Sequence, residues 1–257
     1  MASIKLENLL IGYTHNRQAQ PVMGVINATL KSGELVALIG ANGAGKSTLM
    51  RTLSAFQMPL DGTIIYPDGN NKVNKPSELA TQIAVVLTDN KTINGLTVRE
   101  VVSLGRTPYT NFIGFRRKHD EEIIEKSMQQ AGVEHLQNRP IETLSDGERQ
   151  KCMIAKALAQ KTPIIILDEP TSYLDFYSRV QLFRMLRTLA HETDKAILVS
   201  THDLELVLQL ADKIWLIHNK KMYTGSVEEL VKKGVLQEFI DNDGIYYNIS
   251  DNRIQIE

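Results

Sequence analysis

Three groups of residues in this 257-residue chain have the types and spacing that bind phosphate or activate water. The first is LVALIGANGAGKST, from Leu35 to Thr48, in which an apolar run leads into a glycine-rich segment that opens a helix. The segment matches G-x-x-x-x-G-K-[ST], whose backbone N–H groups converge on phosphate oxygens. It predicts a site for ATP, with a glycine-rich turn before a helix as the structural alternative.

Each residue type in this loop has a physical role. Glycine lets the backbone bend tightly, Lys46 brings a point charge to the β- and γ-phosphates, and Ser47 supplies a hydroxyl ligand to Mg²⁺. The expected nucleotide contacts are Gly40, Ala41, Asn42, Gly43, Ala44, Gly45, Lys46, Ser47 and Thr48.

The second group is PIIILDEP, residues Pro163 to Pro170, in which an apolar strand ends in two carboxylates. Asp168 follows the strand where a Mg²⁺ ligand is needed, and Glu169 is the expected general base that polarises the attacking water. The alternative is that either carboxylate caps the turn before Pro170. The phosphate loop earlier in the chain favours the catalytic interpretation.

The third group is LSDGERQ, residues Leu144 to Gln150, at the start of an expected helix. Ser145 and Glu148 have the spacing of a helix capping box, which is a sufficient local interpretation. The motif order is more specific: phosphate loop, L-S-x-G-x-x-Q, Asp-Glu strand, TSYLD and then STHD. That order resembles the ATP-binding cassette (ABC) ATPases over nearly the whole chain.

The resemblance implies an α/β fold, with a RecA-like P-loop core, an antiparallel β subdomain and an α-helical subdomain. It also implies a homodimer that sandwiches two Mg-ATP. Ser145 and Gly147 would then contact the γ-phosphate of the ATP held by the opposite subunit. The family usually has L-S-G-G-Q, so Asp146 and Glu148 add two carboxylates near a polyphosphate. Because like charges repel, we expect Asp146 to face away from the nucleotide.

Four further site residues follow from the resemblance. His202 corresponds to the histidine that contacts the γ-phosphate and helps hold the attacking water, and with Glu169 and Lys46 it completes the catalytic set. Asp175 corresponds to an acid at the dimer interface, although it could equally cap a helix. Tyr13 corresponds to the aromatic that stacks on adenine. Thr88 stands where the family has a glutamine that contacts Mg²⁺, and Asp89 follows it.

The segment VVSLGRTPYTNF, beginning at Val101, is similar to the G-R-x-P-[YH] stretch of importer ATPases for iron-siderophores, haem and cobalamin. In those relatives the helical subdomain receives a short helix of a polytopic membrane permease, so Arg106 and Tyr109 are expected at the rim of that groove. An extracytoplasmic substrate-binding protein is implied as an indirect partner. The structural alternative for this segment is an exposed loop stiffened by Pro108. For the function of the whole chain, the alternatives are an export ATPase, a non-transport ABC ATPase that acts on DNA or ribosomes, and a degenerate nucleotide-binding module.

Short apolar runs and helical spacings supply the elements that must position these residues. Four runs predict buried parallel strands: 35–39, 83–87, 164–167 and 196–199. Helical spacing predicts helices at 46–56, 97–104, 120–131, 147–160, 175–191 and 204–210, with Thr97 and Glu100 as a capping box. Strands at 4–10, 25–30, 63–66, 213–217 and 221–224 predict an antiparallel portion. A helix at 226–240 and a hairpin are expected at the end of the chain.

Composition narrows the function classes. Lys and Arg total 29 against 30 Asp and Glu, so there is no basic excess and no nucleic-acid partner is expected. The single cysteine, Cys152, excludes an intramolecular disulfide. The N-terminus lacks a signal pattern, and no apolar run reaches membrane-spanning length. We expect one ABC ATPase domain, cytoplasmic and peripheral on the inner face of the cell membrane. Its parts are a core at 1–90 and 161–225, a helical subdomain at 91–160 and an extension at 226–257.

Overall fold

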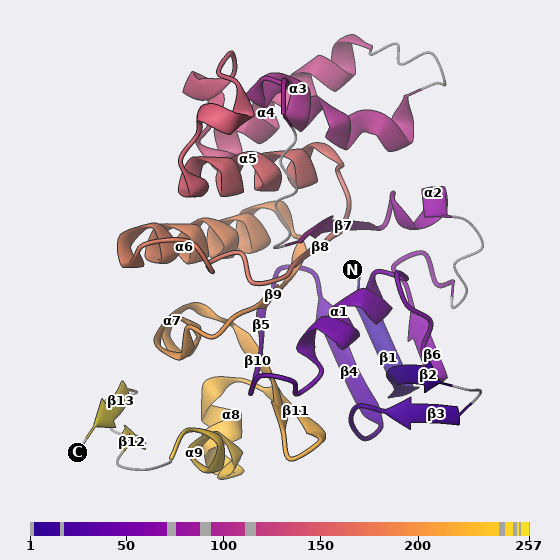
Figure 1. Cartoon of the computed structure of the whole chain (residues 1–257), viewed down its shortest axis with the longest axis vertical. Coiled ribbons are helices and arrows are strands. Elements are labelled where there is room, and N and C mark those ends of the chain that lie inside the picture. Colours follow the sequence, from indigo (N-terminus) through magenta and orange to yellow (C-terminus); the bar gives the residue numbers. More distant parts are fainter. Residues whose placement is uncertain are drawn as a thin grey trace.

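The computed structural model describes residues 3–15, 18–70, 76–87, 94–110, 117–241, 245–248, 251 and 253–256. A six-stranded sheet in the order β11-β10-β5-β9-β8-β7 forms its centre (Figure 1). Five strands run parallel, with β11 antiparallel at one edge. Their bounds are β5 (Leu35–Gly40), β7 (Ile83–Val86), β8 (Ile164–Leu167), β9 (Ala196–Ser200), β10 (Lys213–His218) and β11 (Lys221–Gly225). The four predicted parallel strands are confirmed.

The parallel strands are apolar throughout because both faces of the sheet are covered. In β5, Leu35, Ala37 and Ile39 pack into one core cluster, and Val36 and Leu38 pack into another. The first cluster includes residues of α5 (Asp146–Ala159), α6 (Phe176–Thr193) and α7 (Leu204–Leu210). The second includes α1 (Lys46–Leu53) and a three-stranded antiparallel sheet.

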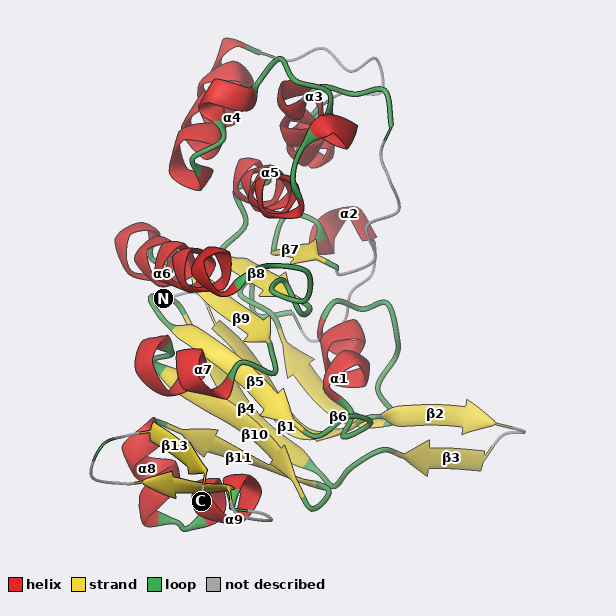
Figure 2. Cartoon of the chain, turned by 60° about the vertical axis from the view of Figure 1, so that its left-hand side comes forward, coloured by secondary structure: helices red, strands yellow, loops and turns green. Residues whose placement is uncertain are grey.

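That antiparallel sheet has the order β4-β1-β6 and lies beside the central sheet (Figure 2). Its strands are β1 (Ser3–Leu10), β4 (Ile26–Lys31) and β6 (Asp61–Ile65). Residues 213–217 and 221–224 form the predicted antiparallel hairpin, as β10 and β11. Their expected place beside the parallel sheet is wrong, because β10 pairs in parallel with β5 and the hairpin extends the central sheet. A further hairpin, β2 (Gly12–His15) with β3 (Gln18–Pro21), was not predicted.

Helices gather at one end of the molecule, at the top of Figure 1. They are α3 (Val98–Ser103), α4 (Lys118–Ala131), α5 and the 3-10 turns η1 (Leu104–Tyr109), η2 (Glu134–Leu136) and η3 (Ile141–Thr143). The predicted capping box of Thr97 and Glu100 is present at α3. A single-turn helix, α2 (Pro76–Leu79), precedes β7.

Arg106 does not lie on an exposed rim, so that expectation is wrong. The residue is 5% exposed, its Nε lies 2.9 Å from Oδ1 of Asp120, and its Nη1 donates to the carbonyl of Ala159 at 2.8 Å. Its guanidinium also stacks over the ring of Tyr109, at 4.2 Å from the centroid. A buried guanidinium must be paired, and the carboxylate of Asp120 meets that need. Tyr109 itself is 42% exposed, as a rim residue would be.

The end of the chain differs from the prediction in one respect. The single helix expected at 226–240 is divided into α8 (Val227–Lys232) and α9 (Val235–Ile240). Gly234, with φ of 73°, separates them in a backbone conformation that glycine tolerates. The expected hairpin is confirmed as β12 (Ile245–Asn248) paired with β13 (Arg253–Ile256). Among the described residues, no helix has both the length and the apolar character needed to cross a membrane.

Candidate functional site

The predicted phosphate-binding and catalytic residues lie at one edge of the central sheet. β5 leads into the phosphate loop, β8 leads into Asp168 and Glu169, and β9 leads into Thr201 and His202. Since β5, β8 and β9 are parallel neighbours, their carboxyl ends share an edge, which is where α/β sheets bind ligands. The fold therefore brings together segments more than 120 residues apart in sequence.

The phosphate loop is shaped by close backbone approaches. A Cβ on Gly45 would lie 2.7 Å from Cγ1 of Val22, and the residue has φ of 108°, so only glycine fits without displacement. Likewise, a Cβ on Gly40 would lie 2.8 Å from the carbonyl oxygen of Ile217. Ala41, Asn42 and Ser47 are exposed, whereas Thr48 is buried.

Lys46 lies folded against this loop. Its Nζ donates to the carbonyls of Gly40 at 2.8 Å and Ala41 at 3.2 Å. Burial lowers the pKa of Lys46 from its ordinary value, while the charges of Glu169 and Asp168 act in the opposite direction. The Coulombic influence of both carboxylates means that the ammonium group and the Asp-Glu pair share one electrostatic environment.

Asp168 and Glu169 are held by Ser200, the last residue of β9, and by His202, which follows that strand. Oγ of Ser200 donates to Oδ1 of Asp168 at 2.7 Å and accepts a bond from the Glu169 N–H at 2.8 Å. The ring nitrogen Nε2 of His202 lies 3.0 Å from Oε1 of Glu169. The structure thus brings the two predicted catalytic residues, Glu169 and His202, into direct contact.

The backbone of Glu169 is in the left-handed region, with φ of 43°, which is uncommon for a residue with a side chain. Such conformations persist where the surroundings hold them, and they cluster at functional sites. Here Ser172 Oγ donates to the carbonyl of Glu169 at 3.1 Å and to its Oε2 at 3.2 Å. The carboxylate is therefore fixed at both oxygens.

Ser145 caps helix α5 at its amino end. The Glu148 N–H donates to Ser145 Oγ at 3.3 Å, and Glu148 Oε2 accepts from the backbone and hydroxyl of Ser145, each at 2.9 Å. These bonds, the backbone one foremost, lower the pKa of Glu148. Asp146 pairs with Arg149 at 3.3 Å. The capping interpretation of Ser145 is thus correct locally, and the serine is exposed at the helix start.

Gly147 connects this helix start with the segment after Glu169. A Cβ on Gly147 would lie 3.7 Å from Cδ2 of Leu174 and 3.7 Å from Oγ of Ser178. Nearby, Asp175 caps α6, since its Oδ1 accepts from the Ser178 N–H at 2.8 Å. That bond is the main cause of the lowered pKa of Asp175. Ser145, Gly147 and Asp175 therefore lie in one surface region. In the sequence, these residues are far from the phosphate loop.

Tyr13 lies next to the phosphate loop, while Thr88 lies outside the described residues. The hydroxyl groups of Tyr13 and Thr48 are 2.9 Å apart, which joins β2 to helix α1. The ring of Tyr13 remains half exposed, which leaves aromatic surface for a ligand.

The ABC transporter family description matches residues 23–172 of the chain. The chain belongs to the ABC transporter family. An uncharacterised ABC transporter ATP-binding protein of Methanocaldococcus jannaschii is 41% identical over 95% of this chain and 83% of its own length. A probable siderophore transport system ATP-binding protein of Bacillus subtilis is 34% identical over 92% of this chain and 85% of its own length.

Solved ABC structures share this fold. A dimeric bacterial ABC transporter cassette has a TM-score of 0.73 and 27% identity, covering 87% of this chain and 98% of that one. In this ABC protein, the phosphate loop, Asp168, Glu169 and His202 lie together at one edge of the central sheet. The recognition of an ABC ATPase from its motifs, and of its RecA-like α/β fold, is confirmed.

The oxygen donors in this ABC protein fit Mg²⁺. Ser47 offers a hydroxyl and Asp168 a carboxylate, and Mg²⁺ in nucleotide sites is held by one or two carboxylates together with substrate phosphates. Within the described ranges, no three His, Cys, Asp or Glu side chains form a metal-binding group.

Two contacts beside the site are not indicated by the sequence patterns. One is made by Ser200, which bonds Asp168 and Glu169. The other is the ion pair between Arg179 Nη1 and Asp203 Oδ1 at 2.5 Å, which ties α6 to the residue after His202. The only sequence signal for Ser200 was a polar residue directly after the apolar strand 196–199. No local pattern indicated Arg179, because its partner is 24 residues away.

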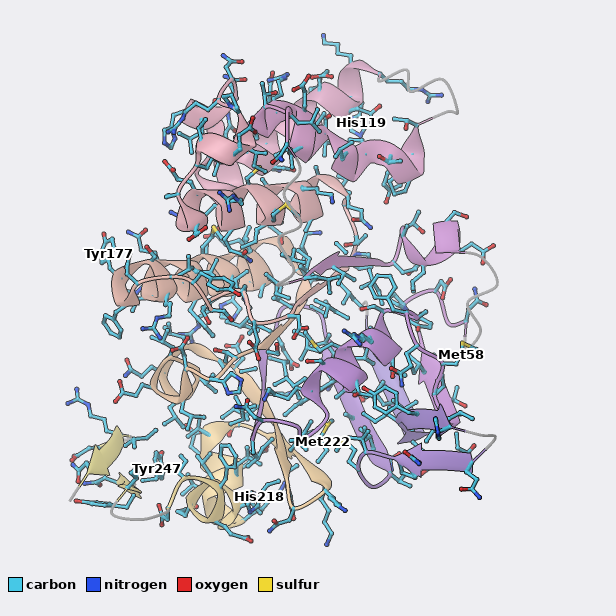
Figure 3. All side chains as sticks on the ribbon, viewed as in Figure 1. Met58, His119, Tyr177, His218, Met222 and Tyr247 are labelled. Atoms are coloured by element: carbon cyan, nitrogen blue, oxygen red, sulfur yellow. The ribbon has the colours of Figure 1, made fainter. Side chains whose placement is uncertain are left out.

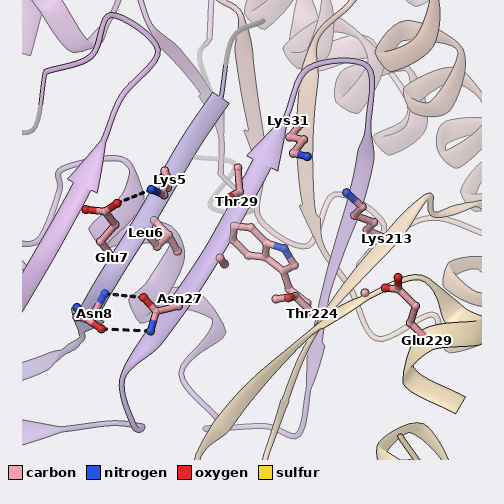
Figure 4. Close-up of a pocket in the computed structure, with 13 residues that line it drawn as sticks. Lys5, Leu6, Glu7, Asn8, Asn27, Thr29, Lys31, Lys213, Thr224 and Glu229 are labelled. Carbon is pink, nitrogen blue, oxygen red and sulfur yellow. Dashed lines mark hydrogen bonds and ion pairs between the residues drawn. The ribbon is translucent and has the colours of Figure 1, made fainter. Parts of the chain in front are cut away.

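A separate hollow of about 830 Å³ lies between β1, β4, β10 and α8 (Figure 4). Figure 4 shows Lys5 paired with Glu7, and the two bonds between Asn8 and Asn27. Lys213 pairs with Glu34 at 2.6 Å. The charges of Lys5, Glu7 and Lys213 are thus paired within the protein. We assign no ligand to this hollow.

Proposed function

We propose that this chain is the ATP-hydrolysing subunit of an ABC importer for an iron chelate such as a siderophore, for haem or for cobalamin. The observation that carries the ATPase part is the contact of His202 with Glu169, 3.0 Å, at the sheet edge that holds Lys46. The importer part rests on the G-R-T-P-Y segment and on the Bacillus subtilis relative, whose name is that of a siderophore transport protein.

The proposed reaction uses each residue at a stated atom. The loop from Gly40 to Thr48 binds the triphosphate of ATP, and the ring of Tyr13 stacks on adenine. Oε of Glu169 accepts a proton from the attacking water, which contributes about 10² to 10⁴-fold to such reactions. His202 orients this carboxylate and contacts the γ-phosphate, while Lys46 balances its charge. Mg²⁺ held by Ser47 and Asp168, with Thr88 as a further proposed ligand, would neutralise charge that develops on the phosphates.

We further propose that two copies form a homodimer with Ser145 and Gly147 of one copy on the nucleotide of the other. Three aromatic residues support this surface: Tyr173, Phe176 and Tyr177 are 70%, 64% and 70% exposed and flank Asp175. Figure 3 shows Tyr177 at the outer end of α6. Exposed apolar patches mark interaction sites. The related cassette of known structure is a dimer.

The division of the chain follows from these roles as a proposal. Residues 1–90 and 161–225 form the nucleotide core, 91–160 form the helical part that contacts a polytopic membrane permease, and 226–257 are an extension. An extracytoplasmic substrate-binding protein would deliver the solute to that permease. The subunit would then work in the cytoplasm, peripheral on the inner face of the membrane. The balanced charge argues against a nucleic-acid partner.

Affinity purification of the tagged chain from detergent-treated membranes tests the proposal. The expected result is a complex with a polytopic membrane protein whose ATPase activity rises when a ligand-loaded binding protein is added. Identification of that ligand as an iron chelate, haem or cobalamin supports the importer assignment. Purification with ribosomes or DNA, or outward movement of solute in vesicles, contradicts it.

A further inference from the structure

One buried hydroxyl bonds both acidic residues of the site, Asp168 through its carboxylate and Glu169 through its backbone N–H. Ser200 is fully buried at the end of β9. Its Oγ donates to Oδ1 of Asp168 at 2.7 Å and accepts from the N–H of Glu169 at 2.8 Å. A serine hydroxyl has one donor hydrogen and two acceptor lone pairs. The hydroxyl thus uses its donor on the expected metal ligand and an acceptor on the expected general base.

The bond to Asp168 limits rotation of the carboxylate. The terminal torsion of an aspartate is broad, so packing alone fixes its plane poorly. Hydrogen bonds from neighbouring residues orient metal-ligating side chains and influence metal affinity strongly. Because Ser200 is anchored in the central sheet, next to β8 and β5, its hydroxyl gives Asp168 a rigid reference.

The bond to Glu169 acts on the backbone. The residue has φ of 43°, and this conformation needs support from its surroundings. Ser172 bonds the carbonyl and Oε2, and His202 contacts Oε1. The bond from the Glu169 N–H to Ser200 anchors the residue from the sheet side. Without it, Glu169 is left to its contacts with Ser172 and His202, which are both exposed.

We propose that Ser200 is a positioning residue that fixes Asp168 and Glu169 relative to each other. This inference rests on the proposed function of both carboxylates. Ser200 acts through them and does not itself contact the nucleotide. It therefore affects the chemical step and the Mg²⁺ requirement more than the affinity for ATP.

A buried serine elsewhere provides a matched control. Ser127 in α4 is 3% exposed, and its Oγ donates to the carbonyl of Ile123 at 2.7 Å within the same helix. Replacing either serine by alanine removes one buried hydroxyl. Only Ser200→Ala removes a bond to the carboxylates of the site.

The experiment compares Ser200→Ala, Ser200→Thr and Ser127→Ala with the wild type, after far-UV circular dichroism has verified folding. The readouts are kcat, KM and the Mg²⁺ concentration for half-maximal thermal stabilisation by a slowly hydrolysed ATP analogue. For Ser200→Ala we expect kcat to fall by about tenfold or more, the range of one lost positioning interaction, with KM almost unchanged. Its Mg²⁺ midpoint should rise by about threefold or more. Ser200→Thr, which keeps the hydroxyl, should restore both values.

Equal values for Ser200→Ala and Ser127→Ala would overturn the proposal. Equal losses in Ser200→Ala and Ser200→Thr would also overturn it, because packing rather than the hydroxyl would then be responsible. A wild-type protein that binds ATP without hydrolysing it would instead contradict the proposed function. In that case the Mg²⁺ midpoint, which measures binding alone, still decides the role of Ser200.

Discussion

His202 and Glu169 are 33 residues apart in the chain, yet Nε2 of His202 lies 3.0 Å from Oε1 of Glu169. The contact exists because β8 and β9 are adjacent parallel strands, so the residues that follow them meet at one edge. A second histidine, His191, makes a similar contact at 2.9 Å with Oδ2 of Asp212, close to where β5 begins. Both are contacts between a histidine ring and a carboxylate, but only that of His202 lies at the sheet edge that holds the phosphate loop.

Replacement of His202 by alanine should reduce kcat by about 10²-fold, because Glu169 loses the partner that orients its carboxylate. Binding of ATP to the isolated subunit should remain, since the phosphate loop is intact. Steady-state ATPase assays and nucleotide titrations measure the two effects. His191→Ala is the matched control, and its kcat should stay near the wild-type value. Equal losses in both variants would remove His202 from the catalytic set.

The aromatic surface beside Asp175 should contribute to association of two copies. Aromatic residues are enriched among the interface positions whose truncation costs about 2 kcal/mol or more of binding free energy. Phe176→Ser with Tyr177→Ser should therefore weaken ATP-driven dimerisation by about tenfold or more. Sedimentation of a Glu169→Gln background with Mg-ATP gives the measurement. Tyr246→Ser, which alters a tyrosine on β12 that is 38% exposed, is the control. A wild-type dimerisation constant in the double variant would contradict the proposed interface.

The buried pair of Arg106 and Asp120 should be important for stability. Arg106→Met leaves the 6%-exposed Asp120 without its guanidinium partner, and breaking a buried pair in this way typically costs about 3–5 kcal/mol. Denaturant unfolding measures this loss. Arg99→Met removes a partner of Glu121 and Glu125 at the surface, where a pair contributes about 0–1 kcal/mol. If both variants lost similar amounts of unfolding free energy, burial would not be what makes the pair of Arg106 and Asp120 important.

Lys195 should make the free energy of unfolding depend on pH in the alkaline range. Burial, together with the nearby charge of Lys161, lowers the pKa of Lys195 to about 8 from an ordinary value of 10.5. Between these values the unfolded chain binds the proton and the folded chain does not, so raising the pH favours folding. Between pH 8 and 10.5, the free energy of unfolding of the wild type should therefore rise by about 3 kcal/mol relative to that of Lys195→Met. Denaturant unfolding at several pH values measures this difference, and a difference independent of pH would contradict the lowered pKa.

The elements could be predicted where local pattern and tertiary packing agree. Apolar runs such as residues 164–167 become central strands because both faces of the sheet are buried. Thr97 and Ser145 cap helices because their partners, Glu100 and Glu148, lie three residues away. Gly234 shows the limit, since helical spacing continued through 226–240 and did not indicate where the backbone would turn.

Contacts between distant segments could not be predicted in this way. Arg106 looked like an exposed residue of a Pro-containing loop, but the start of α4 and the end of α5 enclose it. The resemblance implies an adenine contact for Tyr13, but its bond to Thr48 is evident only in the fold.

By itself, the sequence determined the chemistry of this ABC protein: a glycine-rich phosphate loop, an Asp-Glu pair after an apolar strand, and a serine at a helix start. The tertiary structure alone decided how the carboxylates are held, through Ser200, Ser172 and His202. The reason is physical. Residue types and local spacing specify what a group can donate or accept, whereas strand order in the sheet decides which groups come within hydrogen-bonding distance.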